Sequence, residues 1–459
     1  MAMNKGIKSV WGISEVGFSM MSTMETVFFM IFLTDVALLP LSITGIIAGS
    51  TAIIDAISAV IAGIVIDKVT FKSGKYRPWL LICPPIVTAF FVLMFTKIGG
   101  DVTAGLLIGL GYVMSHFIWN ICWTANRNLI PVISKDQNDR SWLSARIAMG
   151  SNLGKLAGSY LVPPITTALF AVFGATAGST APVPAYTVAA LLMALCFVAT
   201  YYVHYGITKG CDTVEKGAKA VTFKDMGRAI ATNDQLIVVL LHDALRLIGY
   251  YGLATLTTYY AKCVLGVPGD AGIMLVFFYL GCIVGSGFSS RLAKKLGPKK
   301  TTMLGVGGWL VCQATLIFLP ANLVVVCAML FVGQVFFGFA YGLTSNLYAM
   351  CGTYGEWKTG GQARGVTMSF CSLAIKLGVA IRGMIIPAVL AAVGYVATAA
   401  DPTAFAGGIQ SAFGIMPAAC LALSFVPLIF FKLTDEKVAS MDKEISERKT
   451  AEAASEPAE

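Results

Sequence analysis

Charged residues are scarce in this chain of 459 residues: Asp, Glu, Lys and Arg make up 12% of it, and hydrophobic residues 57%. A soluble domain carries roughly 25% charged residues, so this chain lacks the charge that a water-covered surface needs. The mean hydropathy is +0.77. The composition therefore excludes an ordinary soluble protein and favours one whose surface lies in lipid.

Clusters of reactive side chains are lacking as well. The 11 Cys residues are scattered, there are only 3 His residues, and no CxxC or HExxH motif occurs. This pattern excludes a disulfide framework and a tightly bound metal. No Ser–His–Asp set is evident either. We expect a protein that is not an enzyme and holds no cofactor.

Long apolar runs are abundant. About 20 apolar residues span the ~30 Å hydrocarbon core as a helix. The runs predict twelve transmembrane helices, at 10–36, 41–66, 78–97, 103–126, 143–173, 185–207, 234–264, 269–290, 301–319, 323–349, 365–395 and 409–432. The prediction is an all-α membrane protein.

The net charge of +9 is unevenly distributed. Lys and Arg gather in the termini and in alternate loops, at 68–77, 127–140, 209–228, 291–300 and 358–364. By the positive-inside rule, these loops and both termini are cytoplasmic. The charge thus indicates a multi-pass protein of the bacterial inner membrane, with the lipid bilayer as its partner and no role in nucleic-acid binding.

The basic loops repeat along the chain. Shifting 68–77 by 223 residues gives 291–300, and shifting 127–140 gives 350–363. The repeat predicts two pseudo-symmetric six-helix bundles of the major facilitator fold, with a solute site between them. The predicted parts are a first bundle at 1–207, a linker at 208–233, a second bundle at 234–433 and a cytoplasmic tail at 434–459. Gly150, Gly154 and Gly158, at four-residue spacing, predict close helix packing, and we expect their helix to contribute to the contact between the halves.

Charges inside the predicted spans cost at least ~2.5–3.5 kcal/mol each at mid-bilayer, so each needs a reason. They are Glu15, Glu25, Asp55, Arg146, Lys155, Asp243, Arg246, Lys376 and Arg382. Arg146 and Lys376 suit an anionic or hydroxyl-rich solute, or they pair with Glu15 or Asp55. Asp243 and Arg246, three residues apart, are expected to pair with each other. Lys155 and Arg382 are further possible charge partners.

Asp55 lies in the middle of the second span. Thr51 and Ser58 share its helix face. A carboxylate beside hydroxyl groups suits a hard cation or a proton carrier, and a buried Lys or Arg could instead neutralise it. We interpret Asp55 as the coupling residue, with Thr51 and Ser58 beside it.

Aromatic residues gather in the fourth span. Trp119 and Trp123 lie four residues apart with Asn120 between them. Sugar faces stack on such rings, and amides bond sugar hydroxyls. Interfacial Trp residues are also common in membrane proteins, so a sugar site and a structural role remain open.

Four stretches resemble the glycoside–pentoside–hexuronide:cation symporters, the melibiose-permease-like branch of the major facilitator superfamily. They are the run from FLTDVALLP to KSGKYRPWL, then NLIPVISKDQNDRSWLSAR, YGEWKTGGQARG and LTDEKVASMDKEISERK. The resemblance extends over nearly the whole chain.

The resemblance implies alternating-access transport of a sugar or glycoside with a coupling ion. It implies that Asp55 binds the cation and that Lys376 lies between the sugar and cation sites. Glu15, Arg146 and Asn120 match sugar-binding positions. Where the family often has a second carboxylate one turn after Asp55 and a hydroxyl in helix 4, this chain has Ala59 and Phe117. These departures favour a proton over Na⁺ as the coupling ion.

The sequence thus predicts a monomeric secondary active transporter that carries a sugar, glycoside or sugar acid with H⁺ or Na⁺. Glu15, Trp119, Asn120, Trp123, Arg146 and Lys376 are the candidate solute-binding residues. The excess of positive charges among the buried candidates favours an anionic, uronate-like solute. The alternatives are an uncoupled uniporter, with Lys155 paired to Asp55 as a built-in cation, and a carrier of another organic anion or of a lysolipid.

Overall fold

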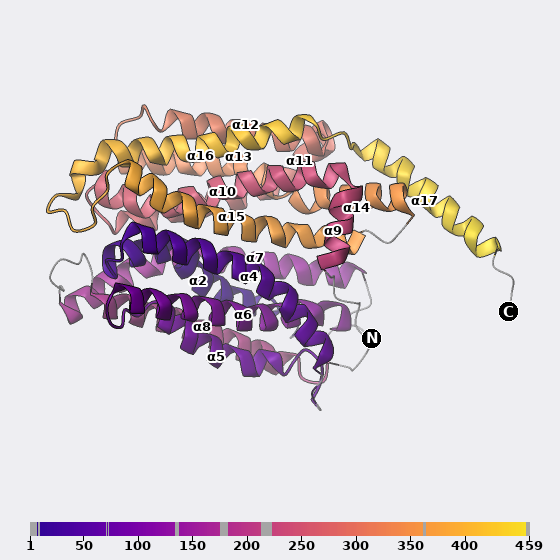
Figure 1. Ribbon diagram of the computed structural model, residues 1–459. Coiled ribbons are helices and arrows are strands. Elements are labelled where there is room, and N and C mark those ends of the chain that lie inside the picture. Colours follow the sequence, from indigo (N-terminus) through magenta and orange to yellow (C-terminus); the bar gives the residue numbers. More distant parts are fainter. Residues whose placement is uncertain are drawn as a thin grey trace.

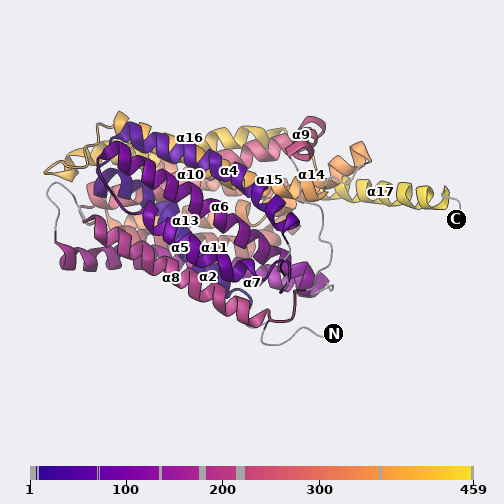
Figure 2. The same cartoon turned by 60° about the horizontal axis from the view of Figure 1, so that its bottom comes forward.

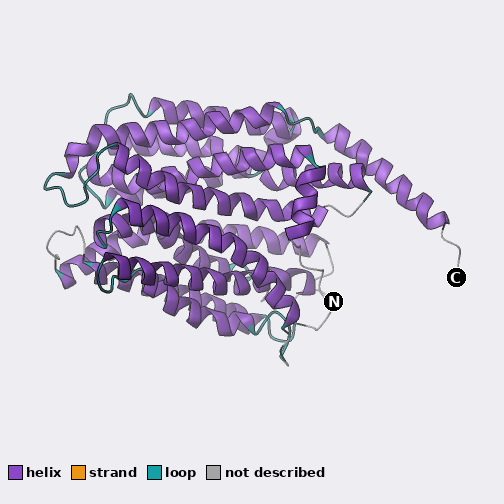
Figure 3. Cartoon of the chain, viewed as in Figure 1, coloured by secondary structure: helices purple, strands orange, loops and turns teal. Residues whose placement is uncertain are grey.

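The computed structural model describes residues 7, 10–69, 71, 73–133, 137–174, 182–212, 223–360 and 364–455. Its regular structure within these ranges is helical, and Figure 3 draws no strand there.

The first half of the chain forms six membrane-crossing helices. The first crossing is not one regular α-helix, because two π-helical turns interrupt it. The elements are α2 (Ile13–Thr23), η1 (Met24–Phe28), α3 (Phe29–Ile31) and η2 (Phe32–Val36), then α4 (Leu41–Lys68), α5 (Trp79–Met94), α6 (Asp101–Ile133), α7 (Gln137–Phe173) and α8 (Val183–Ile207).

The second half forms six more crossings after the short helix α9 (Phe223–Thr232). They are α10 (Asp234–Cys263), α11 (Asp270–Leu296), α12 (Pro298–Thr315), α13 (Leu323–Tyr341) continued by α14 (Thr344–Thr359), α15 (Arg364–Ala392), and η3 (Pro402–Phe405) with α16 (Ala406–Ile429). The tail helix is α17 (Asp435–Ser455).

The twelve crossings fall where the apolar runs predict them. Nine helical segments of the described residues are long and apolar enough to span a membrane. Leu41–Thr51 and Trp79–Met94 are shorter apolar segments of α4 and α5, and α12 completes the set. The chain is therefore a multi-pass α-helical membrane protein.

The two halves lie as separate layers. Figure 1 shows the indigo and magenta helices of the first half below the red to yellow helices of the second. The halves meet where α4 packs on α15 and α7 on α11, and α4 lies beside α15 in Figure 2 as well. The end with the loops at 71–78 and 208–212 and with α17 is named here the terminal face. The opposite end, with the loops at 37–40, 95–100 and 393–401, is the far face.

Glycines let helices of the same half approach closely. A Cβ added at Gly154 would lie 2.3 Å from the Val16 backbone oxygen, and one at Gly150 would lie 2.2 Å from that of Gly12. The expected glycine stripe thus packs α7 against α2 within the first half. The contact of α7 with α11 across the halves involves other residues, such as Gly272 beside Pro163.

Several helices are longer than the apolar runs that predict them. α6 and α7 cover most of the basic loop expected at 127–140, and α14 continues to Thr359. At 1.5 Å per residue, a helix of 33 residues such as α6 extends well past the hydrocarbon core. Hydropathy marks only the part of a helix that lies in lipid.

The tail packs on the second half. The Trp357 indole on α14 donates to the Glu444 carboxylate over 2.7 Å, and Arg448 donates to the Trp357 backbone oxygen over 2.9 Å. Val438 and Met441 pack against a buried apolar cluster around Leu347 and Phe370. The polar composition of the end at 451–459 predicts disorder, which is wrong for 451–455, because these residues are helical. Residues 456–459 lie outside the described residues. The predicted bounds of bundles, linker and tail stay predictions.

We predict that Gly154→Ala destabilises the protein by about 1–3 kcal/mol, because its methyl group would overpack the contact with α2. The thermal unfolding midpoint in detergent measures the effect. Gly109→Ala on α6 is the matched control, since a Cβ there meets nothing within 4 Å. Equal midpoints for the two variants would contradict this packing argument.

Candidate functional site

An ion pair joins the halves at the middle of the bundles. The ammonium of Lys376 on α15 lies 2.5 Å from Oδ2 of Asp55 on α4. The side-chain amide of Asn120 on α6 donates to Oδ1 of Asp55 over 2.7 Å. Both carboxylate oxygens therefore have a donor. The pairing offsets the cost of two charges held inside the membrane.

Asp55 is bound by a protein cation, one of the two lysines considered as its partner from the sequence. Lys376, rather than Lys155, is its partner. Thr51 and Ser58 lie on the same helix face, yet their hydroxyls donate to the backbone oxygens of Ile47 and Ile54 over 2.5 and 2.8 Å. A cation or proton that binds Asp55 has to displace Lys376.

A second ion pair lies in the first half, closer to the terminal face. Arg127 on α6 donates to the buried Glu15 carboxylate of α2 over 3.2 Å, and its guanidinium lies 4.5 Å from the centre of the Trp123 ring. The Arg127 side chain is 38% exposed. Trp123 and Arg127 thus offer a partly exposed aromatic ring beside a cation.

Trp119 is placed differently from Trp123. It is buried, with ring centres 5.1 Å from Phe18 and 4.0 Å from His116. Its surroundings are those of a packing residue that supports α6. Trp123, which is only partly buried, is the ring of the pair that a solute can reach.

Lys155 on α7 lies between the halves. The groups that act on its charge are Glu15 in the first half and Tyr251 and Tyr341 in the second. Its ammonium makes no hydrogen bond or ion pair within the described ranges, since Arg127 takes Glu15 and Lys376 takes Asp55. Lys155 is only partly buried. It therefore presents a positive charge between the halves that makes no direct bond to a carboxylate of the described residues.

Arg146 does not join this group. Nine residues separate it from Lys155, which places the two on opposite faces of α7. Arg146 lines a hollow with Ile13 and Leu153, and its guanidinium lies 4.8 Å from the centre of the Trp142 ring. In the described residues, Arg146 makes no hydrogen bond or ion pair with Glu15, Asn120 or Lys376.

Asp243 and Arg246 form a buried ion pair in the second half, as expected from their spacing. Arg246 also donates to the Thr344 hydroxyl over 3.0 Å, and Tyr348 donates to Asp243 over 3.4 Å. These bonds connect α10 with α14. The pair is part of the internal structure of the second half.

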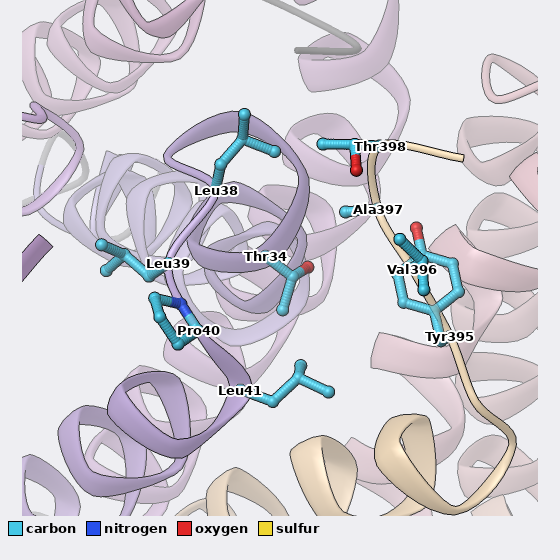
Figure 4. Close-up of a pocket in the computed structure, with 9 residues that line it drawn as sticks. All are labelled: Thr34, Leu38, Leu39, Pro40, Leu41, Tyr395, Val396, Ala397 and Thr398. Atoms are coloured by element: carbon cyan, nitrogen blue, oxygen red, sulfur yellow. The ribbon is translucent and has the colours of Figure 1, made fainter. Parts of the chain in front are cut away.

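The far face is closed by a polar cluster that joins the halves. Asp35 of η2 pairs with Lys262 of α10 and accepts a hydrogen bond from the Tyr395 hydroxyl. Beside it, the Thr34 and Tyr259 hydroxyls lie 2.7 Å apart. Figure 4 shows Leu38 to Leu41 on one side of a hollow of about 250 Å³ and Tyr395 to Thr398 on the other. The cluster and this hollow mark the closed end of the bundles.

Sequence reasoning missed Arg127 and Lys262. Arg127 lies seven residues after Asn120, and that spacing places both on one face of α6. It was assigned to a loop because the apolar run ends just before it. Asp35 lies at the end of the predicted span 10–36, where water is expected to be close, but it is fully buried.

The chain matches the family described as MFS/sugar transport protein over residues 10–435. An isoprimeverose transporter of Lactiplantibacillus pentosus is 26% identical over 91% of this chain and 86% of its own length. A glucuronide carrier protein homolog of Escherichia coli K12 is 24% identical over 96% of this chain and 95% of its own. A protein of Bacillus subtilis named as the uncharacterized symporter YjmB is 25% identical over 96% of this chain and 95% of its own length.

Two solved structures share the fold. The nucleoside transporter NupG has a TM-score of 0.64 and 14% identity, over 94% of this chain and all of its own. A bacterial homologue of the human lysosomal transporter Spinster, in an inward-facing and unoccupied conformation, has a TM-score of 0.67 and 13% identity over 93% and 98%. These likenesses confirm the predicted major facilitator fold. The family match shows that the chain belongs to the MFS/sugar transport protein family, and the names of its relatives are consistent with the branch of the glycoside–pentoside–hexuronide symporters.

Proposed function

We propose that the chain is a proton-coupled symporter for a sugar or glycoside that carries an acidic group. The observation that carries this proposal is the Asp55–Lys376 ion pair across the halves. Beside it lie the partly exposed Trp123 and Arg127 and Lys155, which makes no direct bond to a carboxylate of the described residues. Relatives named as an isoprimeverose transporter and a glucuronide carrier homologue support a sugar or glycoside as the solute, and the second name supports an acidic one. A relative named as a symporter supports coupling to an ion.

The solute would lie between the Trp123 ring and Lys155. The ring offers a face on which a sugar stacks, and Arg127 and Asn120 offer donors to its hydroxyls. Lys155, which has no acidic partner among the described residues, would bind the solute's carboxylate. A neutral sugar would leave that ammonium uncompensated, and this favours an acidic one.

Coupling would act through the Asp55–Lys376 bond. While Asp55 is charged, Lys376 ties α4 to α15. A proton on Asp55 removes one charge of the pair and weakens the tie, so the halves can separate. A ligand shifts such an equilibrium only as far as it binds the two states differently, and this bond supplies that difference.

The structure represents the state closed at the far face. Gly383 of α15 lies against the backbone of Ala48 on α4, and the Asp35–Lys262 pair lies further out on the same side. If the termini are cytoplasmic, as the loop charges predict, the far face is periplasmic. The solute would then leave toward the terminal face.

We expect Lys155→Gln to weaken transport of an acidic solute selectively. A hydrogen bond to a charged group contributes about 1.5–3 kcal/mol, which corresponds to roughly a tenfold to hundredfold rise in KM. Counterflow of p-nitrophenyl β-D-glucuronide and of the neutral p-nitrophenyl β-D-glucoside in proteoliposomes measures the selectivity.

Lys358→Gln is the matched control, because Lys358 is exposed and pairs with Asp234 at the surface. It should leave both KM values unchanged. Transport of the glucoside but not of the glucuronide by the wild type would exclude an acidic solute.

For Asp55→Asn, we expect gradient-driven accumulation to fall to the level of protein-free vesicles. The same change leaves Lys376 as an unpaired buried cation, which costs about 3–5 kcal/mol and could unfold the protein. Asp55→Asn/Lys376→Gln removes both charges and serves as the folding control.

Uptake into proteoliposomes is measured with an imposed H⁺ gradient and, separately, an imposed Na⁺ gradient. The proposal requires accumulation with H⁺ in the wild type and none in either variant. Accumulation driven by Na⁺ alone would identify Na⁺ as the coupling ion. Equal accumulation by wild type and variants would disprove the role of Asp55.

A further inference from the structure

Glu25 is a buried carboxylate in the middle of the first crossing that the proposed site does not use. It lies in the π-helical turn η1 and is 3% exposed. Single π-turns within helices occur frequently at functional sites. The hydroxyl of Tyr112 on α6 donates to Oε1 of Glu25 over 3.1 Å, and this is the side-chain partner that the structure gives it.

The cation that acts most strongly on Glu25 is Arg382 of α15, yet the two do not form an ion pair. The Arg382 guanidinium donates instead to the backbone oxygen of Thr26 over 2.6 Å and to the Thr255 hydroxyl over 2.8 Å. Its Nε is buried and has no partner in the described parts of the chain. Arg382 thus lies beside Glu25 but bonds the residue that follows it.

This arrangement fits a neutral Glu25. An ionised carboxylate buried without a cation is costly, and a nearby guanidinium that keeps one donor free would be drawn to it. A protonated carboxyl group exerts no such attraction. It leaves Arg382 bonded to Thr26 of the first half and Thr255 of the second.

We propose that Glu25 is a second proton-binding site of the transport cycle, which holds its proton in the state closed at the far face. This inference rests on the proposed transport function and adds a residue to it. When Glu25 releases the proton, Arg382 turns from Thr26 and Thr255 to the new carboxylate. The Arg382–Thr26 bond between the halves is then replaced by an Arg382–Glu25 ion pair between them, and proton release is thereby linked to the contact of the halves.

Among the described residues, none of the other ionisable groups near Glu25 provides a free cation that could pair with its carboxylate. On α4 and α15, Asp55 and Lys376 neutralise each other. On α6, Tyr112 and the stacked His116 face the site, and on α10 it is Tyr251. On α7, Lys155 lies nearer to Tyr251 and Glu15. Arg382 is therefore the cation left to respond to Glu25.

Infrared difference spectroscopy of the full chain in liposomes tests the site without any solute. The wild type should show the carbonyl stretch of a protonated carboxyl group, which is lost on titration to alkaline pH. Glu25→Gln should remove this band, and Glu25→Asp should keep it at a shifted frequency. Asp234→Asn, an exposed surface change, should leave it unchanged. A band that persists in Glu25→Gln overturns the proposal.

A transport measurement separates this inference from the proposed function. The measured quantity is the ratio of two rates in the same vesicles: accumulation of p-nitrophenyl β-D-glucuronide under an H⁺ gradient, divided by counterflow of the same probe. For Glu25→Gln, this ratio should fall to the value measured in vesicles without a gradient. If the wild type shows the infrared band but does not accumulate the probe, the symport proposal fails, and the inference that Glu25 binds a proton remains valid. A wild-type ratio in Glu25→Gln shows that Glu25 does not carry the coupled proton.

Discussion

The bond between Asp55 and Lys376 is the constraint around which the centre of this protein is arranged. Neither charge is stable alone in the membrane, so α4 and α15 must come together for both to be satisfied. Asn120 holds the second carboxylate oxygen, which fixes α6 beside the pair. Asp35 and Lys262 repeat the same logic at the far face. The protein is thus held closed at the far face by a buried ion pair between the halves.

Much of the architecture could be predicted because lipid imposes strong rules on sequence. Twelve apolar runs, the alternation of basic loops and the repeat at 223 residues gave the fold that the structure and the family match confirm. Most of the buried charged residues could also be found in the sequence, because each interrupts an apolar run. The glycine stripe showed close packing but not its partner helix, because small residues permit contact with any neighbour. It packs against α2.

The pairing of the charges could not be read from the sequence. From the sequence, Lys155 and Lys376 are equally plausible partners for Asp55. Only the arrangement of the helices in space shows that Lys376 is the partner. Arg146 and Lys155 lie two and a half turns apart on α7 and therefore face opposite sides of the helix. The sequence does not show which of these sides faces the solute. Arg127 lies beyond the apolar run, although its helix continues. The sequence therefore predicted which types of residue form the candidate site, but not which of them contact one another.

The contact of α17 with α14 has a practical consequence. Trp357 joins the tail to the second bundle through both Glu444 and Arg448, and apolar side chains of the helix add to that joint. A rigid helical fusion that continues α17 beyond Ser455 would move with the second bundle. Such a fusion provides a fiducial mark for electron microscopy, and a fluorophore on it would report the rocking of one half against the other.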